Sequence, residues 1–422
     1  MKNSKIHYAW WILVALSIIV GIGKGALNNS AGLFLPGVTE DLSIGMGTLT
    51  LYFSVSAIVT MVFLPIGGKL MAKYDIRTII IAGIILQGGA FALFGLMSSV
   101  WGWYILAIPL AMGGVFITVI VGPVVINQWF NTKNGMALGI LSAAGGLFGA
   151  IAQPVTAGLI SELGWRTAYI SVGIAAIVII IPVALLIIKR SPQAHGVQPY
   201  GTDTASDLGE GKYSEAAEEG IDIATARKSS TLYALMLFFF LITSIASFSI
   251  HLPKHLENVG FSIEFAGSVM SAYMIGILIG SLVLGFLVDK FGSKNTAIFA
   301  MATGIIAIGT LVSAPQNTVL ITASVGLFGL ISSSIGIIAP ALTTSLFGRK
   351  NYSQIYAIAS MGLAISSIIV LPAYGFVYDA VGSYVPVLYA IIVMLVINII
   401  CVLYAFSSKK KMDAKNHESK NR

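Results

Sequence analysis

A lysine inside a long apolar run is the residue of this sequence best suited to chemistry. Lys24 lies within the apolar segment 9–34, about 16 residues or roughly 24 Å along a helix from its start. An ammonium group at that depth costs several kcal/mol unless it faces water, a cavity or an opposite charge. Ser17, Gly21, Lys24 and Asn28 recur at helical spacing, which places them on one face. This pattern favours non-covalent binding of an anion.

Two other arrangements of Lys24 compete with binding in a cavity. The side chain could snorkel, but Leu35 lies about 16 Å further along, beyond the reach of roughly 6 Å of a lysine stem. It could also bond to another helix. We expect the cavity, because Gly21, Gly23 and Gly25 leave room for close backbone approach. No Asp or Glu lies within the apolar segments, so Lys24 either binds an anion directly or loses its proton when the site is empty.

Uncharged polar residues on other apolar segments are weaker candidates, and for each of them an interhelical hydrogen bond is the competing role. Together with Lys24, the residues that we expect to bind substrate are Asn28, Tyr52, Ser56, Ser244, Ser247 and Tyr273. His251 and His255 could titrate near neutral pH. For these two we expect solvation at the membrane interface.

The elements that must position these residues are membrane-spanning helices, each of which needs about 20 apolar residues. Twelve such segments occur in the chain, and their ranges are 9–34, 48–70, 78–97, 101–126, 135–161, 166–188, 231–252, 265–288, 295–313, 318–346, 353–376 and 384–406. We therefore expect an all-α membrane protein.

Composition and charge support this class. Hydrophobic residues make up 57% of the 422 residues and charged residues only 10%, whereas soluble domains carry about 25% charged residues. With the N-terminus in the cytoplasm, 21 of the 24 Lys and Arg residues fall on the cytoplasmic side. This bias predicts that both termini are cytoplasmic. The single cysteine, Cys401, excludes an internal disulfide.

An internal repeat divides the chain. A shift of 217 residues places Leu35-Pro36 on Leu252-Pro253 and Phe130 on Phe347, among other matches. Both copies start on the same side and hold six spans, which is typical of transporters with a substrate site between their halves. The predicted domains are an N-terminal half, 1–190, a cytoplasmic linker, 191–230, and a C-terminal half, 231–422. Residues 203–222 carry seven acids and are not expected to form a packed domain.

A loop motif carries a family resemblance. Gly285, Asp289, Lys290, Gly292 and Lys294 resemble the signature G-x-x-x-D-R/K-x-G-R/K-R/K of the major facilitator superfamily. The resemblance implies the major facilitator fold, with two pseudo-symmetric six-helix bundles, and a conformational role for the motif. In the first half, Gly68 to Arg77, Ala72 stands where the motif has Asp and Asp75 where it has Gly.

Finer features resemble one branch of that superfamily, the monocarboxylate porters and oxalate/formate antiporters. They include the opening Tyr8-Ala9-Trp10-Trp11 and the segment Gly135 to Ile140 after Trp129-Phe130. The branch resemblance implies a small monocarboxylate as substrate. However, Ser281 stands where the branch usually has an Arg that holds the substrate carboxylate, so the substrate class is not simply inherited.

The function that these features predict is secondary active transport of a small organic anion by alternating access. The alternative, which the absent Arg motivates, is a carrier or efflux pump for a neutral or cationic amphiphile. A transport-like sensor without flux is a third possibility. Symport, antiport and uniport remain open, and the coupling partner would be a proton or a counter-anion.

Other classes of protein find little support. The sequence holds no Walker loop, HExxH motif or Cys/His cluster, so we expect neither an enzyme nor a bound cofactor or metal. We expect a monomer in the cell (inner) membrane that contacts membrane lipid and the small-molecule substrate, and no nucleic acid.

Overall fold

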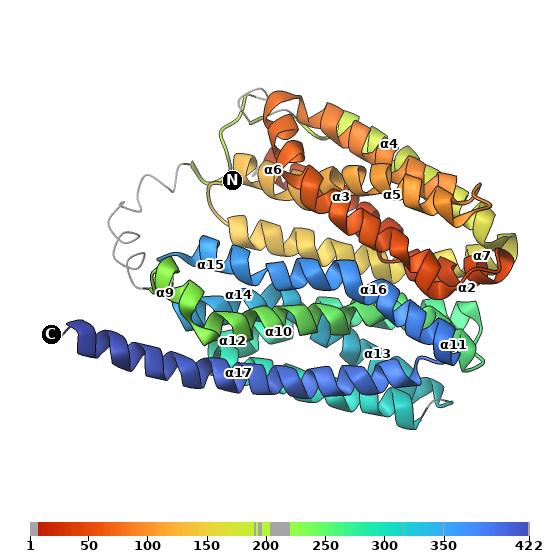
Figure 1. The fold of residues 1–422 in the computed structure, drawn as a ribbon. Helices are drawn as coiled ribbons and strands as arrows, with labels where there is room; N and C mark the ends of the chain where they lie inside the picture. The colour runs from red at the N-terminus through yellow and green to blue at the C-terminus, as the bar shows by residue number, and fades with distance from the viewer. Residues whose placement is uncertain are drawn as a thin grey trace. The chain divides into compact units, whose positions relative to one another are not determined.

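The computed structural model describes residues 7–189, 191–192, 196–202, 220–314, 316–348 and 350–420. Long helices dominate this part of the chain (Figure 1). The described residues contain no strand, only two isolated bridges, Phe130 with Tyr200 and Gly220 with Gly348. The expected all-α class is confirmed.

The described residues form two compact units, one within 1–209 together with 250–271, and one within 210–249 together with 272–422. Segment 250–271 belongs to the second repeat by sequence, yet it packs in the first unit. There Gly32 lies directly against the backbone of Ile250, and the Ser271 hydroxyl donates to the carbonyl of Ala150. The boundary between the two sequence repeats therefore differs from the boundary between the two packed units at this segment.

Helices of the first half follow one another with short connections. They are α1 (Tyr8–Val20), η1 (Gly21–Asn28), α2 (Ala31–Asp41), α3 (Met46–Lys73), α4 (Ile76–Phe94), α5 (Val100–Gly114), η2 (Val115–Ile120), α6 (Val121–Trp129) and α7 (Asn134–Leu186). Segments η1 and η2 are π-helical and continue the α-helices before them without a break.

Helices of the second half are divided differently along the chain. They are α9 (Ile223–Lys228), α10 (Ser230–Ser247), the 3₁₀ turn η5 (Phe248–Ile250), α11 (Leu252–Asn258), α12 (Ile263–Ser313), α13 (Thr318–Ser332), α14 (Ser334–Phe347), α15 (Tyr352–Ala359), α16 (Met361–Val381) and α17 (Val385–Lys420). Side-chain caps stabilise several of the starts: for example, Ser229 accepts from the backbone of Leu232, and Asn317 accepts from that of Leu320.

The described residues form ten continuous helices long and apolar enough to cross a membrane. Two of the ten, α7 and α12, each merge two helices across a kink, at Gly164 and at Gly292. Each merged pair contains two of the predicted spans. The twelve predicted spans are therefore all present as helices.

The backbone conformation at position 292 explains the second glycine of the loop motif. Gly292 has φ 79° and ψ 160°, a region that only glycine occupies without strain. Its counterpart in the first repeat, Asp75, has an extended backbone at φ −63°, and its carboxylate accepts from the backbone N–H of Arg77. Because this turn is built by an N-cap, the first copy does not need glycine there.

The ends of the linker attach to equivalent loops of the two repeats. Tyr200 exchanges backbone hydrogen bonds with Trp129 and Asn131, and its ring lies 5.8 Å from that of Phe130. In the second unit the Ile221 N–H donates to the carbonyl of Phe347. Residues 203–219, most of the segment for which we predicted no packed domain, lie outside the described residues, whereas Gly220 and Ile221 pair with the second half.

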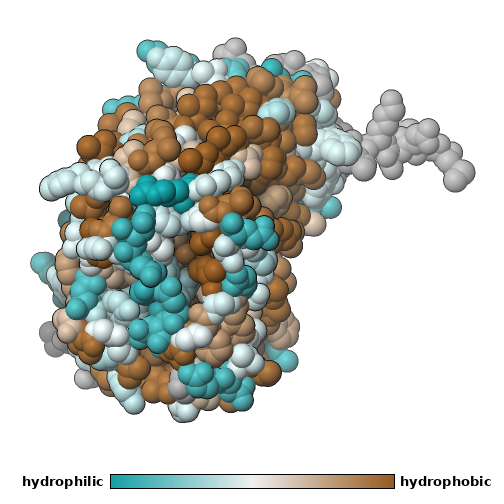
Figure 2. Space-filling model, turned by 90° about the vertical axis from the view of Figure 1, so that its right-hand side faces the viewer, coloured by the Kyte–Doolittle hydropathy of each residue, from teal (hydrophilic) through white to brown (hydrophobic). Residues whose placement is uncertain are grey.

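The outward surface of the helices is apolar. Leu186, Leu282 and Val319 are each more than 70% exposed, as lipid-facing side chains are. Figure 2 views the ends of the helices, and it shows hydrophilic residues gathered on that end face beside broad hydrophobic areas. This distribution fits a protein that crosses the membrane many times.

Replacing Gly292 by Ala tests the backbone argument. The Gly292→Ala variant should lose about 1–3 kcal/mol of stability, because a Cβ disfavours this φ and ψ, and its thermal unfolding midpoint in detergent should fall. Gly285→Ala is the matched control, since Gly285 is helical and has open space around it. An equal fall for both variants would show that the kink does not depend on glycine.

Candidate functional site

Lys24 lies near the middle of the continuous helix Tyr8–Asp41, within η1. The Asn29 N–H donates to the carbonyl of Lys24 at 3.0 Å, five residues back, which is the hydrogen bond of a π-helix. Gly25 lets this segment approach α7: a Cβ there would lie 2.5 Å from the backbone nitrogen of Gly149. The predicted close backbone approach around Lys24 is present.

The Lys24 side chain is exposed, although Gly23 and Gly25 beside it are buried. Its stem lies along Gly145 of α7, where a Cβ would be 3.2 Å from Cδ of the lysine. Within the described part of the chain, its ammonium group has neither a hydrogen bond nor an ion pair. A charge at this depth is tolerated where water reaches it, so the geometry is that of a cation open to an anion.

Two buried glutamines hold η1 in place. Gln87 on α4 donates from Nε2 to the carbonyl of Gly23 at 3.1 Å and to Oδ1 of Asn28 at 3.0 Å. Gln153 on α7 donates to the carbonyl of Asn29 at 2.9 Å. Both side chains are 0% exposed. Because a π-helix changes which carbonyls are bonded within the helix, these amides supply donors that the backbone lacks.

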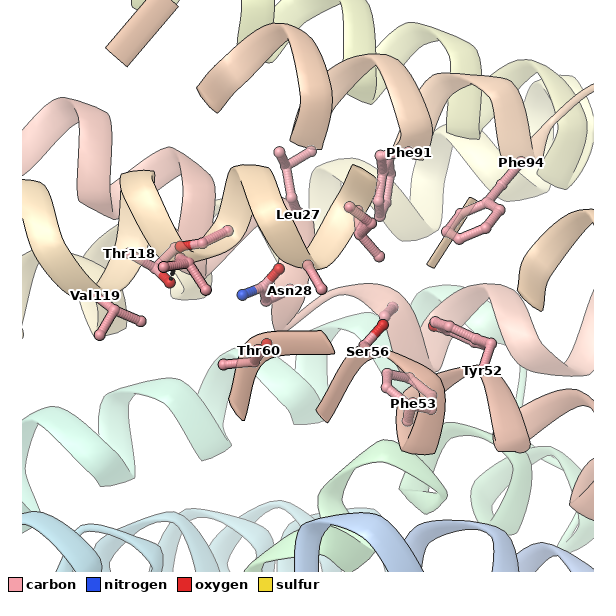
Figure 3. A pocket seen from close by; sticks show the side chains of 15 residues that line it. Leu27, Asn28, Tyr52, Phe53, Ser56, Thr60, Phe91, Phe94, Thr118 and Val119 are labelled. Atoms are coloured by element: carbon pink, nitrogen blue, oxygen red, sulfur yellow. Dashed lines mark hydrogen bonds between the residues drawn. The ribbon is translucent and has the colours of Figure 1, made fainter. Parts of the chain in front are cut away.

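A cavity of about 310 Å³ opens beside Asn28 within the first unit (Figure 3). Its volume lies at the lower end of the range for small-molecule pockets. The residues that line it are Leu27, Asn28, Ala31, Tyr52, Phe53, Ser56, Thr60, Phe91, Phe94, Leu110, Ala111, Gly114, Val115, Thr118 and Val119. They come from η1, α2, α3, α4, α5 and η2, and none of them is charged.

Three of the seven predicted site residues line this cavity: Asn28, Tyr52 and Ser56. Lys24 stands one turn before Asn28 on the same π-helical segment. Sequence reasoning missed Gln87, the aromatic residues Phe91 and Phe94, and the π-helical form of η1. The run Gly21-Ile22-Gly23-Lys24-Gly25 was the only signal for an irregular helix.

The three predicted residues of the second half lie in the other unit, where each side chain contacts its own helix or a neighbouring one. Ser244 is buried, and its hydroxyl is 2.9 Å from that of Ser366. Ser247 donates to the carbonyl of Thr243. Tyr273 is 4% exposed, and its ring lies 5.5 Å from that of Phe328. Their role in binding remains a prediction.

The expectation that His251 and His255 are solvated at the interface is wrong. The two side chains are 0% and 4% exposed, because α11 packs against α2 in the first unit. Burial lowers the pKa of His255 to about 4, since desolvation disfavours the charged ring. His255 is therefore neutral at neutral pH and does not titrate there.

The loop motif lies apart from the cavity in sequence and carries exposed charges. Asp289 is exposed and has no ion pair within the part of the chain that the structure describes. Lys290 stands over the rings of Phe286 and Phe291, and Lys294 over that of Phe406. The motif thus provides an exposed carboxylate next to cations held on aromatic faces.

Comparison with known proteins identifies the family. The sequence matches the profile of the Major Facilitator Superfamily over residues 13–262 and 232–422. An uncharacterized MFS-type transporter, YcxA of Bacillus subtilis, is 22% identical over 68% of this chain and 66% of its own length. Monocarboxylate transporter 11 of Mus musculus is 21% identical over 89% and 83%. The multidrug transporter protein MdtP of Bacillus subtilis is 22% identical over 81% and 70%.

Solved structures agree on the fold. A bacterial homolog of the human lysosomal transporter Spinster, inward-facing and unoccupied, matches with a TM-score of 0.73 at 15% identity, covering 96% of this chain and 98% of that one. The D-xylose-proton symporter matches with a TM-score of 0.69 at 14% identity, covering 94% and 97%. At this identity the likeness shows the fold alone, and the expected major facilitator fold is confirmed.

Substitution of the buried glutamines tests their role in holding η1. Gln87→Leu leaves the carbonyl of Gly23 without its donor and should cost about 1–3 kcal/mol of stability. The measurement is the thermal unfolding midpoint in detergent. Gln128→Leu on α6 is the matched control, because Gln128 is exposed and should tolerate the change. If both variants unfold at the wild-type temperature, Gln87 does not support the segment.

Proposed function

Because the chain belongs to the Major Facilitator Superfamily, we propose that it is a secondary transporter of a small organic anion, with Lys24 as the counter-charge. The family and the fold are those of membrane transporters. The proposal adds the substrate class and alternating exposure of the site by the two halves. It also places the protein in the cell (inner) membrane as a monomer. Symport, antiport and uniport all stay open, and the coupling partner of a coupled carrier would be a proton or a counter-anion.

One observation carries this proposal: Lys24 is an accessible cation at mid-span whose ammonium has no partner in the described residues. Burying an unpaired ammonium group in a bilayer costs free energy, so such residues are rare within membrane spans and usually have a function. The Gly-rich π-helix around it and the buried amides of Gln87 and Gln153 fix its position. A monocarboxylate would complete the arrangement with a charge-assisted hydrogen bond.

A neutral or cationic amphiphile is the second candidate, and the cavity itself favours it. The walls next to Asn28 are apolar or aromatic with a few hydroxyl groups, and no charged residue lines them. Ser281 stands where the related branch has an Arg, and its hydroxyl donates to the carbonyl of Ile277 on its own helix. Similarity to both a monocarboxylate transporter and a multidrug transporter leaves the two candidates to experiment.

Removing the charge of Lys24 separates the two candidates. Lys24→Gln should weaken binding of an organic anion by about 1–3 kcal/mol, the range for a hydrogen bond to a charged group. Lys24→Arg should keep part of the affinity, since the charge persists with a different shape. Binding is measured by calorimetry on the purified protein.

Lys254→Gln is the matched control for this experiment. Lys254 pairs with Glu257 at 2.7 Å, three residues further along α11, and because the Glu257 carboxylate is exposed to solvent the pair contributes little. This variant should bind like the wild type. Unchanged anion affinity in Lys24→Gln would contradict the counter-charge, and tighter binding of a cation would favour the amphiphile.

Asp289 should support the conformational cycle rather than binding. Asp289→Asn removes the exposed charge of the motif and should slow transport in proteoliposomes while substrate affinity stays within a few fold. Asp75→Asn serves as the control, because Asn can replace Asp as an N-cap of α4, and transport should be retained. A collapse of affinity with an unchanged rate in Asp289→Asn would reverse this assignment.

A further inference from the structure

We propose that the first half by itself carries a subsite for the apolar body of the substrate, so that the transported anion is an aryl- or branched-alkyl-substituted monocarboxylate. The subsite is the cavity next to Asn28 (Figure 3). The carboxylate of this ligand rests on the proposed function, in which Lys24 is the counter-charge. Its apolar body is inferred from the cavity alone.

The aromatic end of the cavity is rigid. Tyr52 and Phe94 are each 1% exposed, and their rings lie 5.5 Å apart. Behind Phe94, the ring of Trp103 stacks at 5.7 Å with an interplanar angle of 9°. The ring of Tyr169 lies 5.6 Å from that of Phe94. Because these rings support one another, the wall keeps its shape without ligand and loses little entropy on binding.

The internal repeat shows why space exists here. The shift of 217 residues places Tyr273 opposite Ser56 and Phe328 opposite Ala111. In the second half these two rings are buried and in contact, with centroids 5.5 Å apart. In the first half a serine and an alanine stand at the same places and line the cavity. An aromatic pair fills the position in one copy, and a space that an aromatic or branched group would fill is left in the other.

Asn28 presents a donor to the cavity, and a chain of hydrogen bonds fixes the orientation of its amide. The backbone carbonyl of Gly23 can only accept, so the group of Gln87 that faces it is the NH₂. The same NH₂ bonds the Asn28 side chain, which must therefore present its oxygen to Gln87. The Asn28 NH₂ is left without a partner in the described residues. In Figure 3 its nitrogen points to the side of Thr118.

Together these features define the ligand. The lining holds no charge, so the body that enters it is uncharged. The Asn28 NH₂ suits an oxygen acceptor close to that body, and Lys24 one turn away supplies one positive charge. One carboxylate, one aromatic or branched group and an acceptor oxygen fit this set. A second carboxylate would enter an uncharged lining and would be disfavoured.

A panel of four compounds separates the charged group from the body: propanoate, 3-phenylpropanoate, propanamide and 3-phenylpropanamide. Calorimetry on the full chain in detergent, by displacement for the weak ligands, gives the four affinities. The phenyl group should strengthen binding by about ten- to a hundredfold for the acid and for the amide, the gain expected for burying a ring of this size. The acid should bind more tightly than the amide of the same body.

Two variants fill the cavity with the residues of the second half. Ser56→Tyr and Ala111→Phe should each abolish the gain from the phenyl group while propanoate affinity stays within about threefold of wild type. Ile105→Phe is the control on α5. Because Ile105 is 65% exposed, this substitution adds a ring outside the cavity, and the variant should keep the affinity gained from the phenyl group. Thermal unfolding identifies a variant that fails to fold. The other filled variant then shows whether the gain from the phenyl group is lost.

The outcomes distinguish the subsite from the counter-charge. A wild-type protein that gains nothing from the phenyl group, or a gain that survives in a folded filled variant, would overturn the subsite. Equal affinity for acid and amide in the wild type would instead overturn the counter-charge and leave the subsite standing. In Lys24→Gln the preference for acid over amide should disappear while the gain from the phenyl group remains.

Discussion

A single positive charge in the middle of a membrane span is the constraint on which this site depends. The ammonium of Lys24 needs water or an anion, and the helix around it departs from regular α-helical geometry. Segment η1 is π-helical, and Gly25 brings it against Gly149. The altered backbone bonding then needs outside donors, which Gln87 and Gln153 provide from two other helices. Charge, glycines and glutamines thus belong to one arrangement.

The two halves share a fold but not this arrangement. Both repeats place phenylalanine at the same loop, Phe130 and Phe347, and both loops bind an end of the linker. In the span that holds Lys24, however, the equivalent region of the second half is 231–252, which has no Lys, Arg, Asp or Glu. In α12 and α13 of the second half, the rings of Tyr273 and Phe328 fill the space that Ser56 and Ala111 leave open in the first half. The two copies keep the same helical fold, whereas their side chains differ at the positions of the cation and of the cavity lining.

The sequence predicted the fold well, because a run of apolar residues long enough to cross the bilayer must form a helix there. Three of the residues that it proposed for binding, Asn28, Tyr52 and Ser56, line one cavity, and their role in binding stays a prediction. The sequence could not predict that Gln87 holds Asn28, since a buried amide on another helix leaves no periodic signal. The aromatic wall was equally hidden: Phe91 and Phe94 resemble any apolar residues of a span until their neighbours are known. The prediction that His251 and His255 are solvated was wrong because α11 packs on α2, and a tertiary contact of this kind leaves no pattern in the local sequence.

If Lys24 is the counter-charge that we propose, an organic anion uses more of the candidate site than an amphiphile does. The apolar cavity alone would bind a neutral or cationic compound, but such a ligand would leave the ammonium of Lys24 unpaired and would draw no benefit from it. A cationic ligand would in addition be repelled by the ammonium of Lys24. With a monocarboxylate, the apolar body gains from the aromatic wall and the charge gains from Lys24, and the two contributions come from adjacent turns of the same helix. The cost of keeping a lysine at mid-span is then explained by binding.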